Sequence, residues 1–247
     1  MNLKQFENYK IPVVEIFTSI SGEGISAGEV LTFIRVAGCN LRCSYCDTTY
    51  SYDEKEINNE FITAQEIIKR LKKMGASKIL CTGGEPLETK KQKRYLPIYL
   101  ASKGFDVRIE TNGSNPVYSK EELYIFTDKE RIKLHYVLDV KCPGSGMEKH
   151  NIFEENFLKL HLGDEIKFVV ASQVDIDFAL EVLNKYKSIL SVNEVVINFS
   201  PVFNLIDTKG IVKMLVEKNS YFTEQCLKVR LSLQIHKVIW PPQMRGV

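Results

Sequence analysis

The sequence is 247 residues long, 44% hydrophobic and 26% charged, with a formal net charge of +2 at pH 7. These values are ordinary for a globular protein and favour neither a disordered chain nor binding to nucleic acid or a membrane surface. No apolar run approaches the ~20 residues of a membrane span, and the N-terminal residues are not typical of a targeting segment. We therefore expect a single domain over residues 1–247 in the reducing cytoplasm, where free cysteines persist.

Short β-branched runs alternate with amphipathic stretches along the chain. The predicted strands cover residues 30–36, 78–81, 106–110, 136–140, 165–170, 194–199 and 228–233. One predicted helix begins after Thr63, an N-cap candidate with Glu66 as its capping-box partner, and others cover 96–100, 176–183 and 211–216. This alternation predicts parallel βαβ units in an α/β fold. About six units are too few for an eight-fold barrel, so we expect a partial, laterally open (β/α)6-type barrel with its site at the carboxyl ends of the strands.

Three cysteines, Cys39, Cys43 and Cys46, fall within eight residues directly after the first predicted strand. Three thiolates at this spacing can ligate three irons of a [4Fe–4S] cluster and leave the fourth iron open for chemistry. A zinc site with a histidine as fourth ligand is an alternative, but the nearest downstream histidine is His135. Disulfide bonding is disfavoured, because six cysteines in a chain of this length are too sparse for a disulfide scaffold.

A glycine-rich segment, Thr82-Gly83-Gly84-Glu85-Pro86, directly follows the second predicted strand. Adjacent glycines let the backbone approach a ligand or another segment closely. A lone Gly-Gly-Glu would be read as a turn, but here it follows the cysteine loop by one βαβ unit. The two segments are therefore expected to meet at the same edge of the sheet.

The spacing Cys-x3-Cys-x2-Cys and the Gly-Gly-Glu-Pro segment resemble the motifs of the radical S-adenosylmethionine (SAM) enzymes. The resemblance implies the partial barrel of that superfamily, a [4Fe–4S] cluster on the three cysteines, and SAM chelated to the fourth iron. Cleavage of SAM would give a 5′-deoxyadenosyl radical that abstracts a hydrogen atom from the substrate. By the same resemblance, the residues that bind SAM are Tyr45, Gly84, Glu85, Asn112, Asp139, Val140 and Lys141.

Four further segments resemble the 7-carboxy-7-deazaguanine synthase family within that superfamily. They are Ile20-Ser21-Gly22-Glu23-Gly24, Arg35, Cys46-Asp47-Thr48, and the C-terminal run 230–237. The fork of an arginine suits a planar carboxylate, and the resemblance makes Thr48 a ligand of Mg²⁺. Gln234 and His236 are expected to alternate onto one face of the last strand. The implied substrate-binding residues are Ile20, Ser21, Gly22, Glu23, Arg35, Thr82, Gln234 and His236.

The resemblance implies a lyase that converts 6-carboxy-5,6,7,8-tetrahydropterin to 7-carboxy-7-deazaguanine, with loss of ammonia, in queuosine or other deazapurine biosynthesis. Its cofactors would be the [4Fe–4S] cluster, SAM and Mg²⁺, and no side chain is assigned acid–base work. An external, flavodoxin-like one-electron reductant and a homodimeric state are also implied.

Two other classes of protein share some of these motifs. An activating enzyme for a glycyl-radical enzyme or an anaerobic ribonucleotide reductase would act on a protein partner, and would not need Arg35, Thr48 or the Gln234–His236 segment. A non-catalytic electron-transfer module would not need Gly83 and Gly84.

Overall fold

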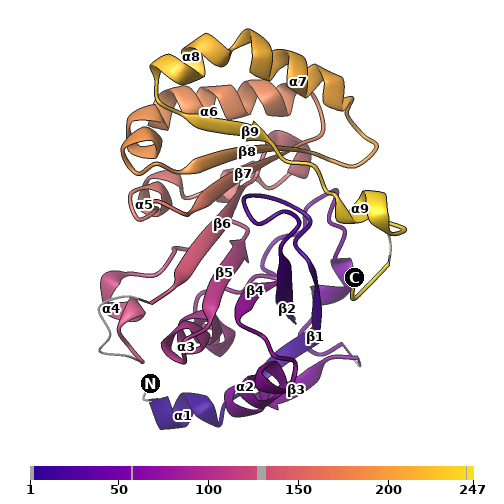
Figure 1. Ribbon diagram of the computed structural model, residues 1–247, viewed down its shortest axis with the longest axis vertical. Coiled ribbons are helices and arrows are strands. Elements are labelled where there is room, and N and C mark those ends of the chain that lie inside the picture. Colours follow the sequence, from indigo (N-terminus) through magenta and orange to yellow (C-terminus); the bar gives the residue numbers. More distant parts are fainter. Residues whose placement is uncertain (1–2, 57, 127–131, 243) are drawn as a thin grey trace.

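The computed structural model describes residues 3–56, 58–126, 132–242 and 244–247. Within these residues nine strands form one sheet in the order β3-β1-β2-β4-β5-β6-β7-β8-β9 (Figure 1). The strands are β1 Lys10–Ile20, β2 Val30–Val36, β3 Glu60–Thr63, β4 Lys78–Gly83, β5 Asp106–Thr111, β6 Leu134–Val140, β7 Glu165–Val170, β8 Val196–Pro201 and β9 Lys228–Leu231. The helices are α1 Leu3–Glu7, α2 Ala64–Lys73, α3 Leu96–Ser102, α4 Lys120–Leu123, α5 Phe153–Phe157, α6 Gln173–Val192, α7 Thr208–Glu217, α8 Asn219–Glu224 and α9 His236–Ile239.

The sheet is a partial, laterally open barrel. Strand β2 and all of β4 to β9 run parallel to one another, whereas β1 is antiparallel to β2 and β3 is antiparallel to β1. In the part of the chain that the structure describes, β3 and β9 are the two edges and do not pair with each other. The fold class predicted from strand–helix alternation is therefore confirmed.

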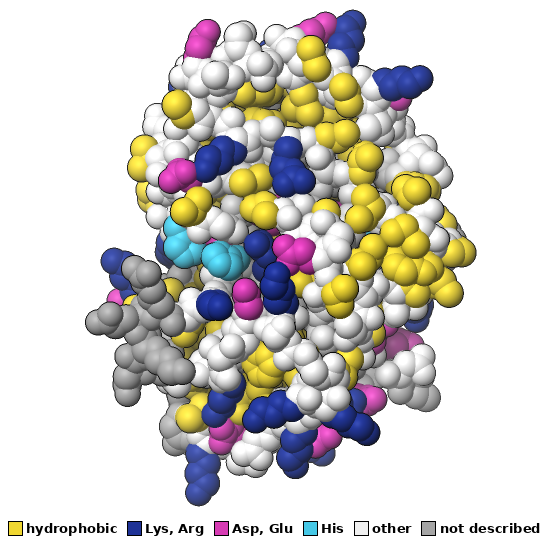
Figure 2. All heavy atoms as spheres, in the orientation of Figure 1, with side chains coloured by type: hydrophobic (Ala, Val, Ile, Leu, Met, Phe, Trp, Pro, Cys, Tyr) yellow, Lys and Arg dark blue, Asp and Glu magenta, His cyan; other side chains and the backbone are white. Residues whose placement is uncertain are grey.

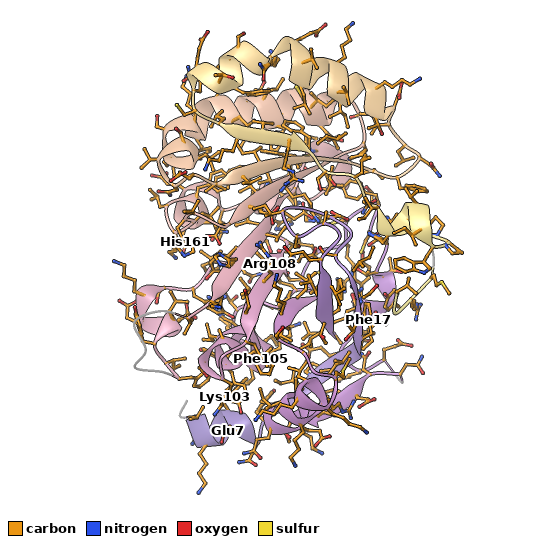
Figure 3. All side chains as sticks on the ribbon, viewed as in Figure 1. Glu7, Phe17, Lys103, Phe105, Arg108 and His161 are labelled. Atoms are coloured by element: carbon orange, nitrogen blue, oxygen red, sulfur yellow. The ribbon has the colours of Figure 1, made fainter. Side chains whose placement is uncertain are left out.

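Strand alternation separates an apolar outer face of the sheet from a polar inner face. In β5, Val107 and Ile109 are fully buried in the apolar core, while Arg108 and Glu110 project from the opposite face. Each buried aliphatic side chain of this kind contributes roughly 1.5–3 kcal/mol. Helices cover the outer face, as α6, α7 and α8 do over β7 to β9 (Figure 1). The inner face is left with charged residues, such as Arg108 (Figure 3). Nη1 of Arg108 lies 3.1 Å from Oε1 of Glu165.

Most predicted elements occur where the sequence pattern placed them. Strands β2 and β7 have the predicted bounds, and Thr63 caps α2 by accepting a hydrogen bond from the backbone N–H of Glu66. The long strand β1 was not predicted, because Pro12 and an irregular register between Val13 and Glu15 interrupt its alternation. Among the described helices, none combines the length and the apolar character needed to cross a membrane.

The prediction for the last strand is wrong in its C-terminal half. Strand β9 ends at Leu231, and Ser232 then donates its backbone N–H to the carbonyl of Phe199. The chain next leaves the sheet, because the N–H of Ile235 donates to the carbonyl of Gly22 rather than to a strand. Gln234 and His236 are thus positioned by a turn and the start of α9, and not by strand alternation.

Candidate active site

One cavity of about 270 Å³ lies at the carboxyl ends of the parallel strands. It collects side chains from β1, β2, β4, β5, β6 and β7 and from the segments that follow them. The predicted site residues that line it are Ile20, Ser21, Gly22, Glu23, Arg35, Cys39, Cys43, Tyr45, Cys46, Thr48, Thr82, Gly84, Asn112, Asp139, Lys141, Gln234 and His236. Glu85 and Val140 do not line it and are buried beside it.

The cysteine loop presents three free thiols to this cavity, each partly exposed. A backbone hydrogen bond attaches the loop to the segment after β6, because the N–H of Ser44 donates to the carbonyl of Ser145 at 3.1 Å. In a [4Fe–4S] cluster each thiolate binds a different iron, so three thiols on one loop beside a cavity suit such a cluster.

The glycine segment packs directly against the backbone of the cysteine loop. The N–H of Gly84 donates to the carbonyl of Val36 at 2.9 Å, and that of Glu85 donates to the carbonyl of Gly38 at 2.8 Å. A Cβ atom on Gly84 would lie 2.0 Å from the carbonyl oxygen of Gly38. Gly84 is therefore required by the contact between two backbones, in addition to any ligand that it touches.

The carboxylate of Glu85 ties this segment to the end of β5. It is fully buried and accepts hydrogen bonds from the N–H of Leu87, the hydroxyl of Thr111 and the N–H of Asn112, each at 2.7 Å. Burial raises the pKa of Glu85, and these three donors oppose that rise. Because both oxygens are engaged, the Glu85 side chain acts on the cavity by holding Asn112 in the cavity wall.

Residues 20–23 also line the cavity. Glu23 accepts from Nε2 of Gln234 at 2.7 Å and pairs with Nζ of Lys167 at 3.0 Å. Burial raises the pKa of Glu23, but Lys167 and Gln234 outweigh it, so the net shift is downward. Burial also lowers the pKa of His236, which favours a neutral imidazole. The Ser21 hydroxyl instead contacts the hydroxyl of Ser26 at 2.8 Å and stays within its own loop.

The guanidinium of Arg35 is held at its Nε atom by the carboxylate of Glu15. Its Nε donates to Oε1 of Glu15 at 2.6 Å, and the hydroxyl of Tyr50 donates to the same oxygen at 3.3 Å. No hydrogen bond to the terminal guanidinium nitrogens of Arg35 is found within the described residues. These two nitrogens form the fork that suits a carboxylate, and Arg35 lines the cavity.

Several lining residues were missed by sequence reasoning. Lys167 could have been found from its inward position in the alternation of β7. Phe17 (labelled in Figure 3) and Phe33 stack across β1 and β2 with ring centroids 4.8 Å apart, and both line the cavity as apolar residues. Val247 also lines the cavity, because the C-terminal segment turns back and places Arg245 3.7 Å from the ring centre of Tyr50.

The open parallel barrel and the three-cysteine cavity together define a radical SAM enzyme. Residues 33–134 match the family model described as the radical SAM superfamily. The chain is 38% identical to the 7-carboxy-7-deazaguanine synthase of Clostridium acetobutylicum over 240 residues, which cover 97% of this chain and 100% of the relative. It is 34% identical to that of Leptospira interrogans, over 98% of this chain and 100% of the relative. The chain belongs to the 7-carboxy-7-deazaguanine synthase family.

A solved structure supports the fold independently. The crystal structure of QueE from Escherichia coli matches with a TM-score of 0.68 and covers 94% of this chain and 97% of that chain. The sequence identity in this match is 21%, so the likeness concerns the arrangement of the backbone.

Proposed function

We propose that this chain converts 6-carboxy-5,6,7,8-tetrahydropterin to 7-carboxy-7-deazaguanine, with loss of ammonia, in queuosine or other deazapurine biosynthesis. The observation that carries the proposal is the shared cavity, in which the cysteine loop faces Arg35, Glu23 and the Gln234–His236 turn. Curated relatives of nearly the same length bear the name of this activity. An activating enzyme for a protein partner is not favoured, because it would not need this second set of residues.

The residues present fit the cofactors that the family implies. Cys39, Cys43 and Cys46 would hold the [4Fe–4S] cluster, and when bound, the cluster and SAM supply the radical that starts the reaction. Asp139 supports a polar ligand beside the thiols, since its buried Oδ1 has no hydrogen-bond partner in the described residues. The residues proposed to bind SAM are Tyr45, Gly84, Glu85, Asn112, Asp139, Val140 and Lys141, with Glu85 and Val140 acting through the backbone or through their neighbours.

The chain's own work is to bind, orient and shield the substrate. The free fork of Arg35 would take the substrate carboxylate in two parallel hydrogen bonds. Glu23, Gln234, His236 and Thr82 would hold the polar edge of the ring, with Ile20, Ser21 and Gly22 contributing backbone contacts. The stacked rings of Phe17 and Phe33 would exclude water from its apolar face.

Thr48 is the proposed protein ligand of Mg²⁺. Its hydroxyl lies 3.7 Å from Sγ of Cys46 and lines the cavity, and Mg²⁺ habitually takes few protein oxygens and keeps several waters. Replacing Thr48 with Ala is expected to raise the Mg²⁺ concentration for half-maximal turnover about tenfold. The measurement is product formation across a Mg²⁺ titration. Thr49→Ala, at the exposed neighbouring position, is the control, and equal Mg²⁺ profiles for both variants would contradict the ligand role.

The activity itself is tested by anaerobic reconstitution with iron and sulfide. The protein is then incubated with SAM, a reductant, Mg²⁺ and the carboxypterin, and the product is identified by mass spectrometry. We expect 7-carboxy-7-deazaguanine to form. Formation of 5′-deoxyadenosine without that product would refute the substrate and leave the radical SAM chemistry standing.

Further features of the protein belong to the same proposal. We propose one domain over residues 1–247, a cytoplasmic location, a flavodoxin-like reductant and a homodimeric state. The homodimer is supported by apolar side chains that gather on the surface around α9 (Figure 2). Val238 and Ile239 of α9 and Leu233, which precedes it, are exposed, and exposed patches of this kind are typical of protein–protein contacts.

A further inference from the structure

Lys93 is a buried lysine beside the cysteine loop that the proposed function does not use. It lies in the short helical turn Gln92–Tyr95 before α3, within a basic run that reads Lys90-Lys91-Gln92-Lys93-Arg94. A run of this composition usually forms a solvated surface. The Lys93 side chain is nevertheless only 1% exposed.

The ammonium of Lys93 joins three segments of the site. It donates to the carbonyl oxygens of Ala37 at 2.8 Å and Gly38 at 2.7 Å, directly before the first cysteine of the loop. It also pairs with Oε2 of Glu88 at 2.8 Å and lies 3.5 Å from Oε1 of Glu54. Glu88 follows the glycine segment, and Glu54 follows the last cysteine of the loop. Because a buried charge without partners is costly, these four acceptors fix the ammonium in place.

The backbone of Gly38 is shaped around this ammonium. Gly38 has φ +89°, and a Cβ atom there would lie 2.5 Å from Nζ of Lys93 and 2.7 Å from Cγ of Glu54. The residue before Cys39 is a glycine because its backbone has a positive φ, and a side chain there would also meet the ammonium. The space beside Gly38 and the hydrogen bonds to the two carbonyls thus both involve the ammonium of Lys93.

We propose that Lys93 is a positioning residue that also sets the reduction potential of the cluster bound by Cys39, Cys43 and Cys46. The inference rests on the proposed function, because it requires that cluster. Reduction adds a negative charge next to the loop, and the potential of a cluster responds to nearby charge and hydrogen bonding. Glu88 and Glu54, whose side chains are 19% and 27% exposed, offset part of this positive charge, whereas the ammonium is hydrogen-bonded directly to the loop carbonyls. Removing the ammonium should therefore disfavour the reduced cluster, and removing the carboxylate of Glu88 should favour it.

The test is an anaerobic redox titration of the reconstituted protein, followed by the electron paramagnetic resonance signal of the reduced cluster. In Lys93→Met the oxidised-to-reduced ratio at the wild-type midpoint is expected to rise about tenfold, a shift of about 59 mV to lower potential. Lys91→Met is the matched control. It removes the same charge from a half-exposed lysine that also pairs with Glu54 but does not reach the loop carbonyls. Its midpoint is expected to stay at the wild-type value.

Glu88→Gln keeps the ammonium and its carbonyl bonds while removing one carboxylate, and its midpoint is expected to move to higher potential. If Lys93→Met does not bind iron, the midpoint of Glu88→Gln tests the inference in its place. A wild-type midpoint in a fully loaded Lys93→Met, equal shifts for Lys93→Met and Lys91→Met, or an unmoved Glu88→Gln would each overturn the inference. A wild-type protein with no reducible [4Fe–4S] signal would instead refute the proposed function.

Discussion

Replacing Gly84 with Ala is expected to abolish most cluster assembly and to destabilise the fold by about 3 kcal/mol, at the upper end for overpacked sites. The added Cβ would lie 2.0 Å from the carbonyl oxygen of Gly38, 2.4 Å from its carbonyl carbon and 3.1 Å from the nitrogen of Cys39. These are all backbone atoms, so no side chain can rotate away to relieve the overlap. The cysteine loop must move instead, and its first thiol moves with it.

Iron content per chain after anaerobic reconstitution and urea unfolding of the iron-free protein measure the two parts of this effect. Gly210→Ala is the control, because Gly210 lies in α7 and a Cβ there meets no atom within 4 Å. Alanine is a better helix former than glycine by up to about 1 kcal/mol, so this variant should be at least as stable as the wild type. Full iron loading in Gly84→Ala would contradict the prediction, because it would show that the glycine segment and the cysteine loop can move apart without loss of the cluster.

Replacing Lys167 with Met is expected to destabilise the protein by about 3–5 kcal/mol, the usual cost of removing one partner of a buried ion pair. Lys167 and Glu23 are both largely buried, both line the cavity, and their charged groups lie 3.0 Å apart. Burial alone would lower the pKa of Lys167, but Glu23, Glu110 and Asp139 raise it well above its usual range. In the variant Glu23 loses the cation that pairs with it and keeps only the hydrogen bond from Gln234, so substrate binding should be lost as well.

The loss should depend on pH in a defined window. The pKa of Glu23 is lowered in the folded protein, so its stabilisation is present above its unfolded value of about 4.3 and lost as pH falls through the folded value. The pKa of Lys167 is raised, so its contribution is present below about 10.4 and lost at higher pH. Urea unfolding should therefore show a larger difference between wild type and variant at pH 7 than at pH 4.

Lys213→Met is the control for this substitution. Lys213 lies on α7 with its side chain 77% exposed, and solvated pairs contribute up to about 1 kcal/mol. Equal free energies of unfolding for Lys167→Met and Lys213→Met would contradict the prediction, because they would mean that Glu23 becomes protonated in the variant at no cost in stability.

The part of the site that consists of motifs, and much of the fold, could be predicted from the sequence, because both depend on residues that are close together in the chain. The cysteine loop and the glycine segment are contiguous, and the β-branched runs mark the strands that deliver them. Lys93 could not be recognised from the sequence as part of the site. A lysine reads the same whether it is solvated or buried, and its burial depends on acceptors that lie far away in sequence, such as the carbonyl of Ala37.

The segment around Gln234 shows a different limit. Its residues were predicted to face the cavity, and they line it, but the reason given was strand alternation. What places them is a backbone bond from Ile235 to Gly22, more than two hundred residues away. Alternation of polar and apolar residues cannot indicate the residue at which a strand stops pairing with the neighbouring strand. The end of β9 is set by the tertiary hydrogen bond that replaces pairing with β8.

That long-range contact has a consequence for how the protein is made. Among the residues that line the cavity, the cysteine loop, the glycine segment and Asn112 are synthesised first, whereas Glu23 lacks its partner Gln234 until the chain has grown 211 positions beyond Glu23. At about 5–20 residues per second, a ribosome needs about 6–24 s to travel from Asn112 to Gln234. Until Gln234 is made the cavity lacks part of its lining, so the free thiols are expected to be less shielded from solvent than in the finished protein.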